Sequence, residues 1–263
     1  MWFAYSLGES GPQSLSSGIM ARVDAKALQA LEAMKSHHDF DSTMSHESLV
    51  AVRKRFSIPN EYVLHAPRPR QQLYHSCPRG FSISIDALEA GLRFPLHPVI
   101  GECLERWRIS PSQVASNSWR YIITFLGECK GSGIVPTRDL FLSCFRLCRG
   151  QGGYYLTSRA GFRVGGAPSN NKGWKARFLF ISRRWGWDFG VELSAHPVSN
   201  VPPNLSDEET NLIRRLKGIL STSRAIRSLT EEWLVEASLS PASHGTPYFP
   251  CLWVSLSDLP TYD

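Results

Sequence analysis

The chain has 263 residues, of which 42% are hydrophobic and 20% charged, and it contains eight Trp, thirteen Phe and eight Tyr. This composition is that of an ordinary globular protein, and it argues against a wholly disordered or fibrous chain. Its apolar runs are far shorter than the roughly 18 residues that a membrane span needs, and residues 1–18 lack the basic start and apolar stretch of a secretory signal. We therefore expect no membrane partner and an intracellular protein, with nucleus and cytoplasm both open.

Six cysteines are expected to be free thiols, because a chain without a secretory signal stays in a reducing compartment. They stand at positions 77, 103, 129, 144, 148 and 251. Only Cys144 and Cys148 are closely spaced, and no second pair of Cys or His matches them as a zinc site would require. We favour core packing for the cysteines within apolar helical patterns, and we expect no metal or other cofactor.

The net charge of +6 is unevenly distributed. Between Lys130 and Arg184 there are eleven Lys or Arg and one acidic residue, Asp139, so this stretch carries +10 and the rest of the chain −4. A concentrated basic region indicates an anionic partner such as nucleic acid. The alternative is a solvated basic face on an ordinary domain.

The N-terminal part is predicted to be helical after a disordered leader. Residues 1–20 are rich in Ser and Gly and have no periodicity. Helical spacing of apolar residues begins at Val23 and reaches Met34, and it returns between Leu49 and Phe56, before Pro59. The proline-containing segment 66–78 is expected to be extended and irregular.

The clearest helical patterns lie in residues 81–150. A short helix is predicted to close at Gly91, and a second to begin with Pro98 in its first turn, next to His97. The run Ser110-Pro111-Ser112-Gln113 is a capping box that opens a helix ending at Gly131 and Gly133. Thr137 is expected to cap a further helix that continues through Cys148 and ends before Gly150.

After Gly150 the pattern changes to short aromatic and β-branched runs punctuated by Gly and Asn. Four of them, at 154–157, 162–164, 177–182 and 188–193, predict a small antiparallel meander. A proline-containing linker follows, then a second capping box at 206–209 that opens an amphipathic helix, and a short helix around Trp233. The predicted fold class is α+β, with a helical N-terminal part packed on a small antiparallel sheet and followed by a short helical tail.

Several phrases occur in a recognisable order. They are Ala90-Gly91-Leu92-Arg93-Phe94-Pro95-Leu96-His97-Pro98, Ile109-Ser110-Pro111-Ser112-Gln113, Ala115-Ser116-Asn117-Ser118-Trp119-Arg120 and Gly173-Trp174-Lys175-Ala176-Arg177-Phe178-Leu179-Phe180. In this order the sequence resembles the plant gypsy-type transposon (transposase, gypsy type) domain of proteins derived from long-terminal-repeat retroelements. The resemblance runs from about Leu49 to Leu193, with mild departures at Ser116 and Leu179.

The resemblance divides the chain into three parts. Residues 1–44 are a leader with a short helix, 45–200 are the gypsy-type transposon domain, and 201–263 are a linker and helical tail. It implies an origin in a retroelement, but it carries over no catalytic residues.

A transposase active site needs several carboxylates around two metal ions about 3.5–4 Å apart. The acidic residues available to the central domain are scattered, mostly on polar helix faces: Asp86, Glu89, Glu102, Glu105, Glu128, Asp139, Asp188 and Glu192. Asp188 and Glu192 could share one side of a strand, but simple surface positions are preferred for them. Zinc-protease, serine-hydrolase, phosphate-loop and zinc-knuckle motifs are also missing. We therefore expect a protein that is not an enzyme, with a transposase-like enzyme and a truncated relic without activity as the alternatives.

A basic sheet face is the candidate site for nucleic acid. Its predicted members are Lys172, Trp174, Lys175, Arg177, Arg183 and Arg184. Strand alternation would place Lys175 and Arg177 on one face, and Trp174 could stack bases beside them. For Trp119, Trp185 and Trp187 core packing is preferred. We expect modest, salt-sensitive binding with little sequence preference, and the C-terminal helices are a second candidate surface, for protein partners.

Overall fold

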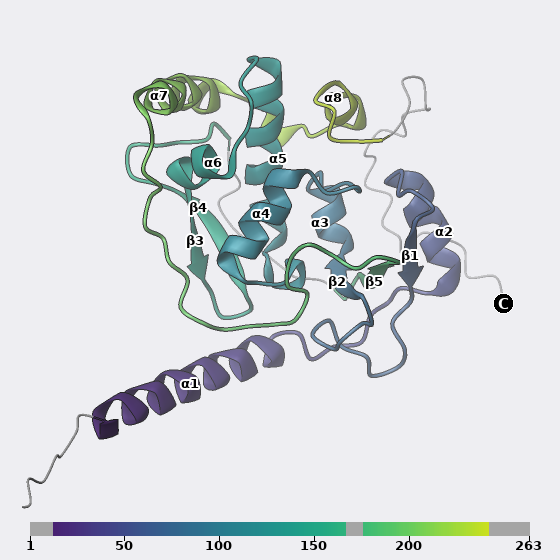
Figure 1. The fold of residues 1–263 in the computed structure, drawn as a ribbon. Helices are drawn as coiled ribbons and strands as arrows, with labels where there is room; N and C mark the ends of the chain where they lie inside the picture. The colour runs from purple at the N-terminus through teal and green to yellow at the C-terminus, as the bar shows by residue number, and fades with distance from the viewer. Residues whose placement is uncertain (1–12, 167–175, 242–263) are drawn as a thin grey trace, which may run out of the picture.

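The structure is a computed structural model that describes residues 13–166 and 176–241, with side chains from residue 25 onward. Its elements follow in the order α1 (Gln13–Ser36), α2 (His46–Arg55), β1 (Tyr62–His65), β2 (Gly80–Ser84), α3 (Ile85–Glu89), α4 (Pro98–Trp107), η1 (Pro111–Gln113), α5 (Ser116–Gly131), α6 (Arg138–Cys144), β3 (Phe145–Arg149), β4 (Tyr154–Ser158), β5 (Phe178–Arg183), α7 (Asp207–Thr222), η2 (Ala225–Arg227) and α8 (Glu231–Glu236). The predicted α+β class is confirmed (Figure 1). Within the described residues, no helix combines the length and the hydropathy needed to cross a membrane.

Two small antiparallel sheets flank a central group of helices. β5 is the middle strand of the first sheet, in the order β1-β5-β2, and the second sheet is the β3–β4 hairpin. Helix α3 contacts β2 and α5, whereas α5 also contacts β4, so these helices lie between the sheets (Figure 1). The first four residues of β5, Phe178 to Ile181, are fully buried, as expected for a central strand covered on both faces.

The predicted meander is wrong in its pairing. β4 pairs with β3, and β5 pairs with β1 and β2, neither of which was predicted as a strand. Residues 162–164 and 188–193 form no strand. Because the partners of β5 lie about a hundred residues earlier in the chain, local spacing alone could not identify them.

The helix predicted to run through Cys148 is also wrong beyond Cys144. Thr137 does cap α6, through a hydrogen bond that its side chain accepts from the amide of Leu140, but the helix ends at Cys144 and β3 follows directly. In β3, Phe145 and Leu147 are buried while Arg146 between them is exposed. That alternation is typical of a strand with one covered face, and it outweighs the apolar spacing that suggested a helix.

Most helix starts agree with the sequence signals. His97 caps α4, since its side chain accepts a hydrogen bond from the amide of Val99, and Pro98 is the first residue of the helix. The Ser110–Gln113 capping box is present but opens the short η1, and α5 begins separately at Ser116. The second capping box, between Ser206 and Glu209, opens α7. At the other end of the chain, α1 begins at Gln13 rather than near Val23, and its N-terminal end points away from the body (Figure 1).

The C-terminal helices pack on the same hydrophobic core as the central domain. Leu216 and Leu220 of α7 and Leu234 of α8 are fully buried in it. Arg93, only 7% exposed, forms an ion pair with Glu231 of α8, with 2.5 Å between Nη2 and Oε2. The buried apolar face of these helices therefore covers the protein's own core rather than standing open to a partner.

Side-chain amides hold the irregular segment between β5 and α7. The Gln113 side chain accepts a hydrogen bond from the Ser194 amide (3.1 Å) and donates one to the Ser194 carbonyl (2.6 Å). Asn200 makes the same pair of bonds with the backbone of Leu147 in β3, at 3.0 and 2.8 Å. These bonds satisfy backbone groups that a strand ladder would otherwise satisfy, so the segment is fixed without being a strand.

Candidate nucleic-acid interface

The six predicted interface residues fall into two groups. Lys172, Trp174 and Lys175 lie outside the described residues. Arg177, Arg183 and Arg184 lie at the two ends of β5, with Arg177 directly before the strand and the other two at its close. At about 3.3 Å per residue, the two ends are on the order of 20 Å apart.

At the start of β5, Arg177 is held by two carboxylates of α3. Its Nη2 lies 2.5 Å from Oδ1 of Asp86 and 3.2 Å from Oε2 of Glu89. Burial by itself would lower the pKa of Arg177, but Glu89 and Asp86 raise it above its ordinary value. Arg55 approaches Glu89 from α2 at 3.6 Å. The positive charge of Arg177 is thus paired with carboxylates within the fold.

At the other end of β5, four residues form an exposed cluster that we name the β5 tip: Arg79, Arg183, Arg184 and Trp185. Arg79 and Arg184 are exposed and Arg183 is half-buried. Within the described parts of the chain, none of these three arginines forms an ion pair, although Glu61 and Asp188 are neighbours in sequence of the strand ends. The β5 tip therefore holds three arginines that no carboxylate of the described residues contacts directly.

Trp185 is the aromatic member of the β5 tip. Its side chain is 80% exposed, so the expectation of core packing was wrong for this residue. The guanidinium of Arg184 lies over the indole, 5.1 Å from the ring centroid. Core packing is correct for Trp119, which is fully buried, and for Trp187, which is half-buried and stacks on Tyr62 with 5.8 Å between ring centroids.

The turn that carries Trp185 is anchored to the sheet. The Gly186 amide donates to the Arg183 carbonyl (3.1 Å), and Gly186 has a φ of +75°, which glycine adopts without strain. The carbonyl of Arg79 accepts from the Arg183 amide (3.3 Å) and from the Trp187 indole (3.2 Å). In return, Nη1 of Arg79 donates to the Arg184 carbonyl (3.3 Å). Two chain segments a hundred residues apart thus fix one surface.

The carboxylates considered for metal chemistry are dispersed over the fold. Asp86 and Glu89 engage Arg177, Glu128 accepts from the Ser223 hydroxyl (2.5 Å), and Asp139 pairs with Arg138 (2.9 Å). Asp188 and Glu192 do not share a strand. In the described ranges, no three His, Cys, Asp or Glu side chains gather closely enough to hold a metal ion.

The described cysteines are all free thiols. Cys103, Cys129 and Cys144 are fully buried, and burial raises the pKa of Cys129 to about 12. A thiol held in this way stays protonated at neutral pH and is a poor nucleophile or metal ligand. Core packing, as expected from the sequence, is therefore their arrangement, whereas Cys148 is half-buried on β3.

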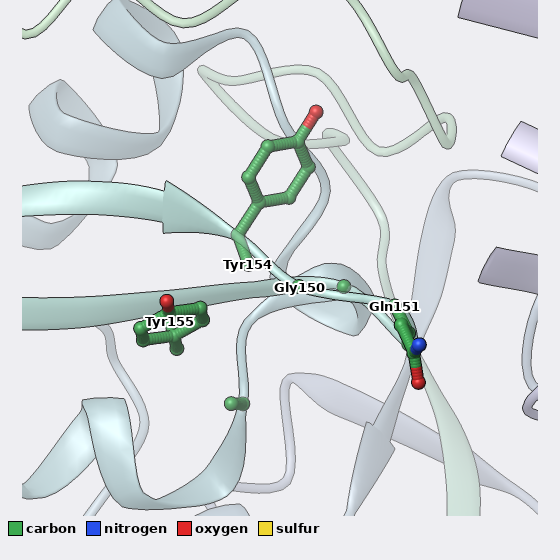
Figure 2. A pocket seen from close by; sticks show the side chains of 7 residues that line it. Gly150, Gln151, Tyr154 and Tyr155 are labelled. Carbon is green, nitrogen blue, oxygen red and sulfur yellow. The ribbon is translucent and has the colours of Figure 1, made fainter. Parts of the chain in front are cut away.

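Two hollows adjoin the turn of the β3–β4 hairpin. The first, of about 150 Å³, is lined by Ala115 and residues 150–155; Figure 2 shows Tyr154 and Tyr155 on opposite sides of β4, with Gln151 at the turn. The second, of about 390 Å³, lies between this turn and α1. Ligand pockets usually measure about 300–1,000 Å³ and contain convergent polar groups. Neither hollow has an acidic side chain in its lining, and the charged residues of the second are Lys26 and Arg149. Neither hollow presents an exposed aromatic ring beside its cations, so we place the candidate interface at the β5 tip, where Trp185 does.

The comparisons with known proteins agree with the resemblance noted from the sequence. Residues 82–149 match the model of a family described as "Putative gypsy type transposon". The match is shorter than the span from Leu49 to Leu193 and leaves the phrase at 173–180 outside it. Comparisons with curated proteins and with solved structures found no match. Residues 82–149 are therefore similar to the gypsy-type transposon family.

Proposed function

We propose that this protein is a non-catalytic, retroelement-derived interaction module that contacts nucleic acid through the β5 tip. The observation that carries the proposal is the contrast in charge compensation along β5. Arg177 is bound by two carboxylates, whereas Arg79, Arg183 and Arg184 form no ion pair with any described residue, and Arg184 lies against the exposed indole of Trp185. Uncompensated arginines beside an exposed aromatic ring suit a phosphate backbone and the bases that it carries.

The charge pattern of the chain supports the same ligand. The tip lies at the end of the basic stretch from Lys130 to Arg184, in which a single acidic residue occurs. Arginine binds phosphate oxygens through a fork of N–H donors, and such contacts release counterions from nucleic acid. Three phosphate contacts predict that the logarithm of the binding constant falls with the logarithm of salt concentration with a slope of roughly −3 on duplex DNA.

The test is a comparison of charge reversals in the full chain. A labelled oligonucleotide should show a rise in fluorescence anisotropy when it binds the wild-type chain at low salt. The triple variant with Arg79→Glu, Arg183→Glu and Arg184→Glu should abolish this rise. The matched control reverses three exposed arginines elsewhere, Arg106, Arg214 and Arg224, and changes the net charge equally. An equal loss of affinity in both triple variants would mean that net charge alone explains the binding, and it would contradict an interface at the β5 tip. Loss with Lys172→Glu and Lys175→Glu, but not with the tip variant, would place the interface at the other end of β5.

The non-catalytic part of the proposal rests on where the carboxylates lie. Asp86, Glu89, Glu128 and Asp139 each bind a basic or hydroxyl group of the fold. Purified protein incubated with Mg²⁺ or Mn²⁺ and labelled DNA is expected to leave the strands intact. Metal-dependent cleavage or joining that co-purifies with the chain and disappears in a variant with a single carboxylate replaced would favour a transposase-like enzyme instead.

A further inference from the structure

The exposed indole of Trp185 restricts the kind of nucleic acid that suits the β5 tip. Two tryptophans, two residues apart, have opposite environments: Trp187 packs against Tyr62 and Phe81, whereas Trp185 stands 80% exposed. Arg184 lies 5.1 Å from the Trp185 ring centroid, on one side of the ring. The rest of the indole is open to solvent, so a flat ligand can stack on it without displacing any part of the core.

The indole is presented on a turn that is already ordered. The hydrogen bonds of Arg79 to Arg183, Arg184 and Trp187 fix the turn against the start of β2. A ligand that binds here pays little to order the backbone, which favours binding by a preformed surface. Arg184 beside the ring, and Arg79 and Arg183 on the two chain segments that meet at the turn, supply the positive charge that a phosphate backbone needs.

We infer that the β5 tip binds single-stranded nucleic acid, with an unpaired base stacked on Trp185 and neighbouring phosphates held by Arg79, Arg183 and Arg184. This inference rests on the proposed function and specifies its ligand. Every base has a flat face, so stacking tolerates any sequence. In an intact duplex those faces are covered by the neighbouring base pairs, and an aromatic side chain reaches them only in loops, ends or single strands.

The experiment measures the affinity of the full chain, per nucleotide, for a labelled oligothymidylate and for a relaxed circular duplex, which is closed and has neither ends nor loops. Wild type should prefer the single strand. Trp185→Leu should weaken single-strand binding by roughly tenfold or more, because one stacked base contributes that much, and should change duplex binding less than about twofold. Trp185→Phe, which keeps an aromatic face, should retain most of the single-strand affinity. Since the side chain is exposed, both variants should unfold at the wild-type temperature.

The outcomes separate this inference from the proposed function. One contrary outcome is that Trp185→Leu weakens the binding of both ligands equally, or of neither, while reversal of the three tip arginines still abolishes binding. That result would reject base stacking on Trp185 and leave the charged interface in place. A wild-type preference for the closed duplex would also reject stacking. If wild type binds neither ligand, the proposed function fails together with the inference.

Discussion

The two ends of β5 carry arginines in opposite circumstances. At its start, Arg177 lies between Asp86 and Glu89 and its charge is used within the fold. At its close, Arg183 and Arg184 share the surface with Arg79 and Trp185 and have no ion-pair partner among the described residues. A basic stretch of sequence is therefore not in itself a basic surface, because helix α3 supplies the acids that neutralise one end of β5 and not the other.

The largest expected effect concerns the stability contributed by the start of β5. Arg177→Ala should lower the free energy of unfolding by about 2–4 kcal/mol, because it leaves the partly buried Asp86 without its counter-charge and Glu89 with only the more distant Arg55. Chemical denaturation of the full chain measures the change. A decrease in the free energy of unfolding of less than about 0.5 kcal/mol would show that these ion pairs contribute no more than exposed surface pairs. The arginines at the two ends of β5 would then not differ in their contribution to stability.

A smaller effect is expected when the acids are neutralised instead. Asp86→Asn with Glu89→Gln keeps hydrogen-bonding groups near Arg177 but removes the charge, at a cost of about 1–2 kcal/mol in the free energy of unfolding. Arg177 would then carry uncompensated charge, so binding to nucleic acid should rise by a few-fold at low salt. Anisotropy titrations measure this gain; an unchanged affinity would mean that the start of β5 lies too far from the ligand path to contribute.

The smallest effect on stability is expected at the tip. Arg183→Gln with Arg184→Gln should change the free energy of unfolding by no more than about 0.5 kcal/mol, since neither side chain has an ionic partner in the part of the chain that the structure describes. The slope of binding against salt should nevertheless become shallower by about 2, one unit for each phosphate contact removed. A large loss of stability in this variant would assign the tip arginines a structural role like that of Arg177.

Signals carried by adjacent residues were readable from the sequence. Pro98 begins α4, and Thr137 and Ser206 cap α6 and α7, as their positions indicated, and the run at 178–181 is a strand. These features depend on a few consecutive residues, because a cap or a strand pattern is a local matter. The α+β class followed from them.

Features that depend on distant partners were not readable. Nothing near Arg177 in sequence shows that Asp86 and Glu89 will reach it, and nothing near Trp185 distinguishes its exposure from the burial of Trp187. Arg79 reaches the tip only because Gly80 and Ser182 face each other across β2 and β5. The sequence thus predicted that the candidate site contains arginines and a tryptophan. Which of these residues come together is determined by the pairing of strands that lie far apart in the chain.

The pairing of the strands also determines which part of the chain can fold by itself. The family match ends at residue 149, the last residue of β3, and β4, its partner in the hairpin, begins five residues later. Strand β2 likewise pairs with β5, which lies wholly beyond the match. A peptide cut to the match would have bare strand edges on both sheets and would tend to aggregate. The unit that sequence comparison detects is therefore smaller than the unit that folds.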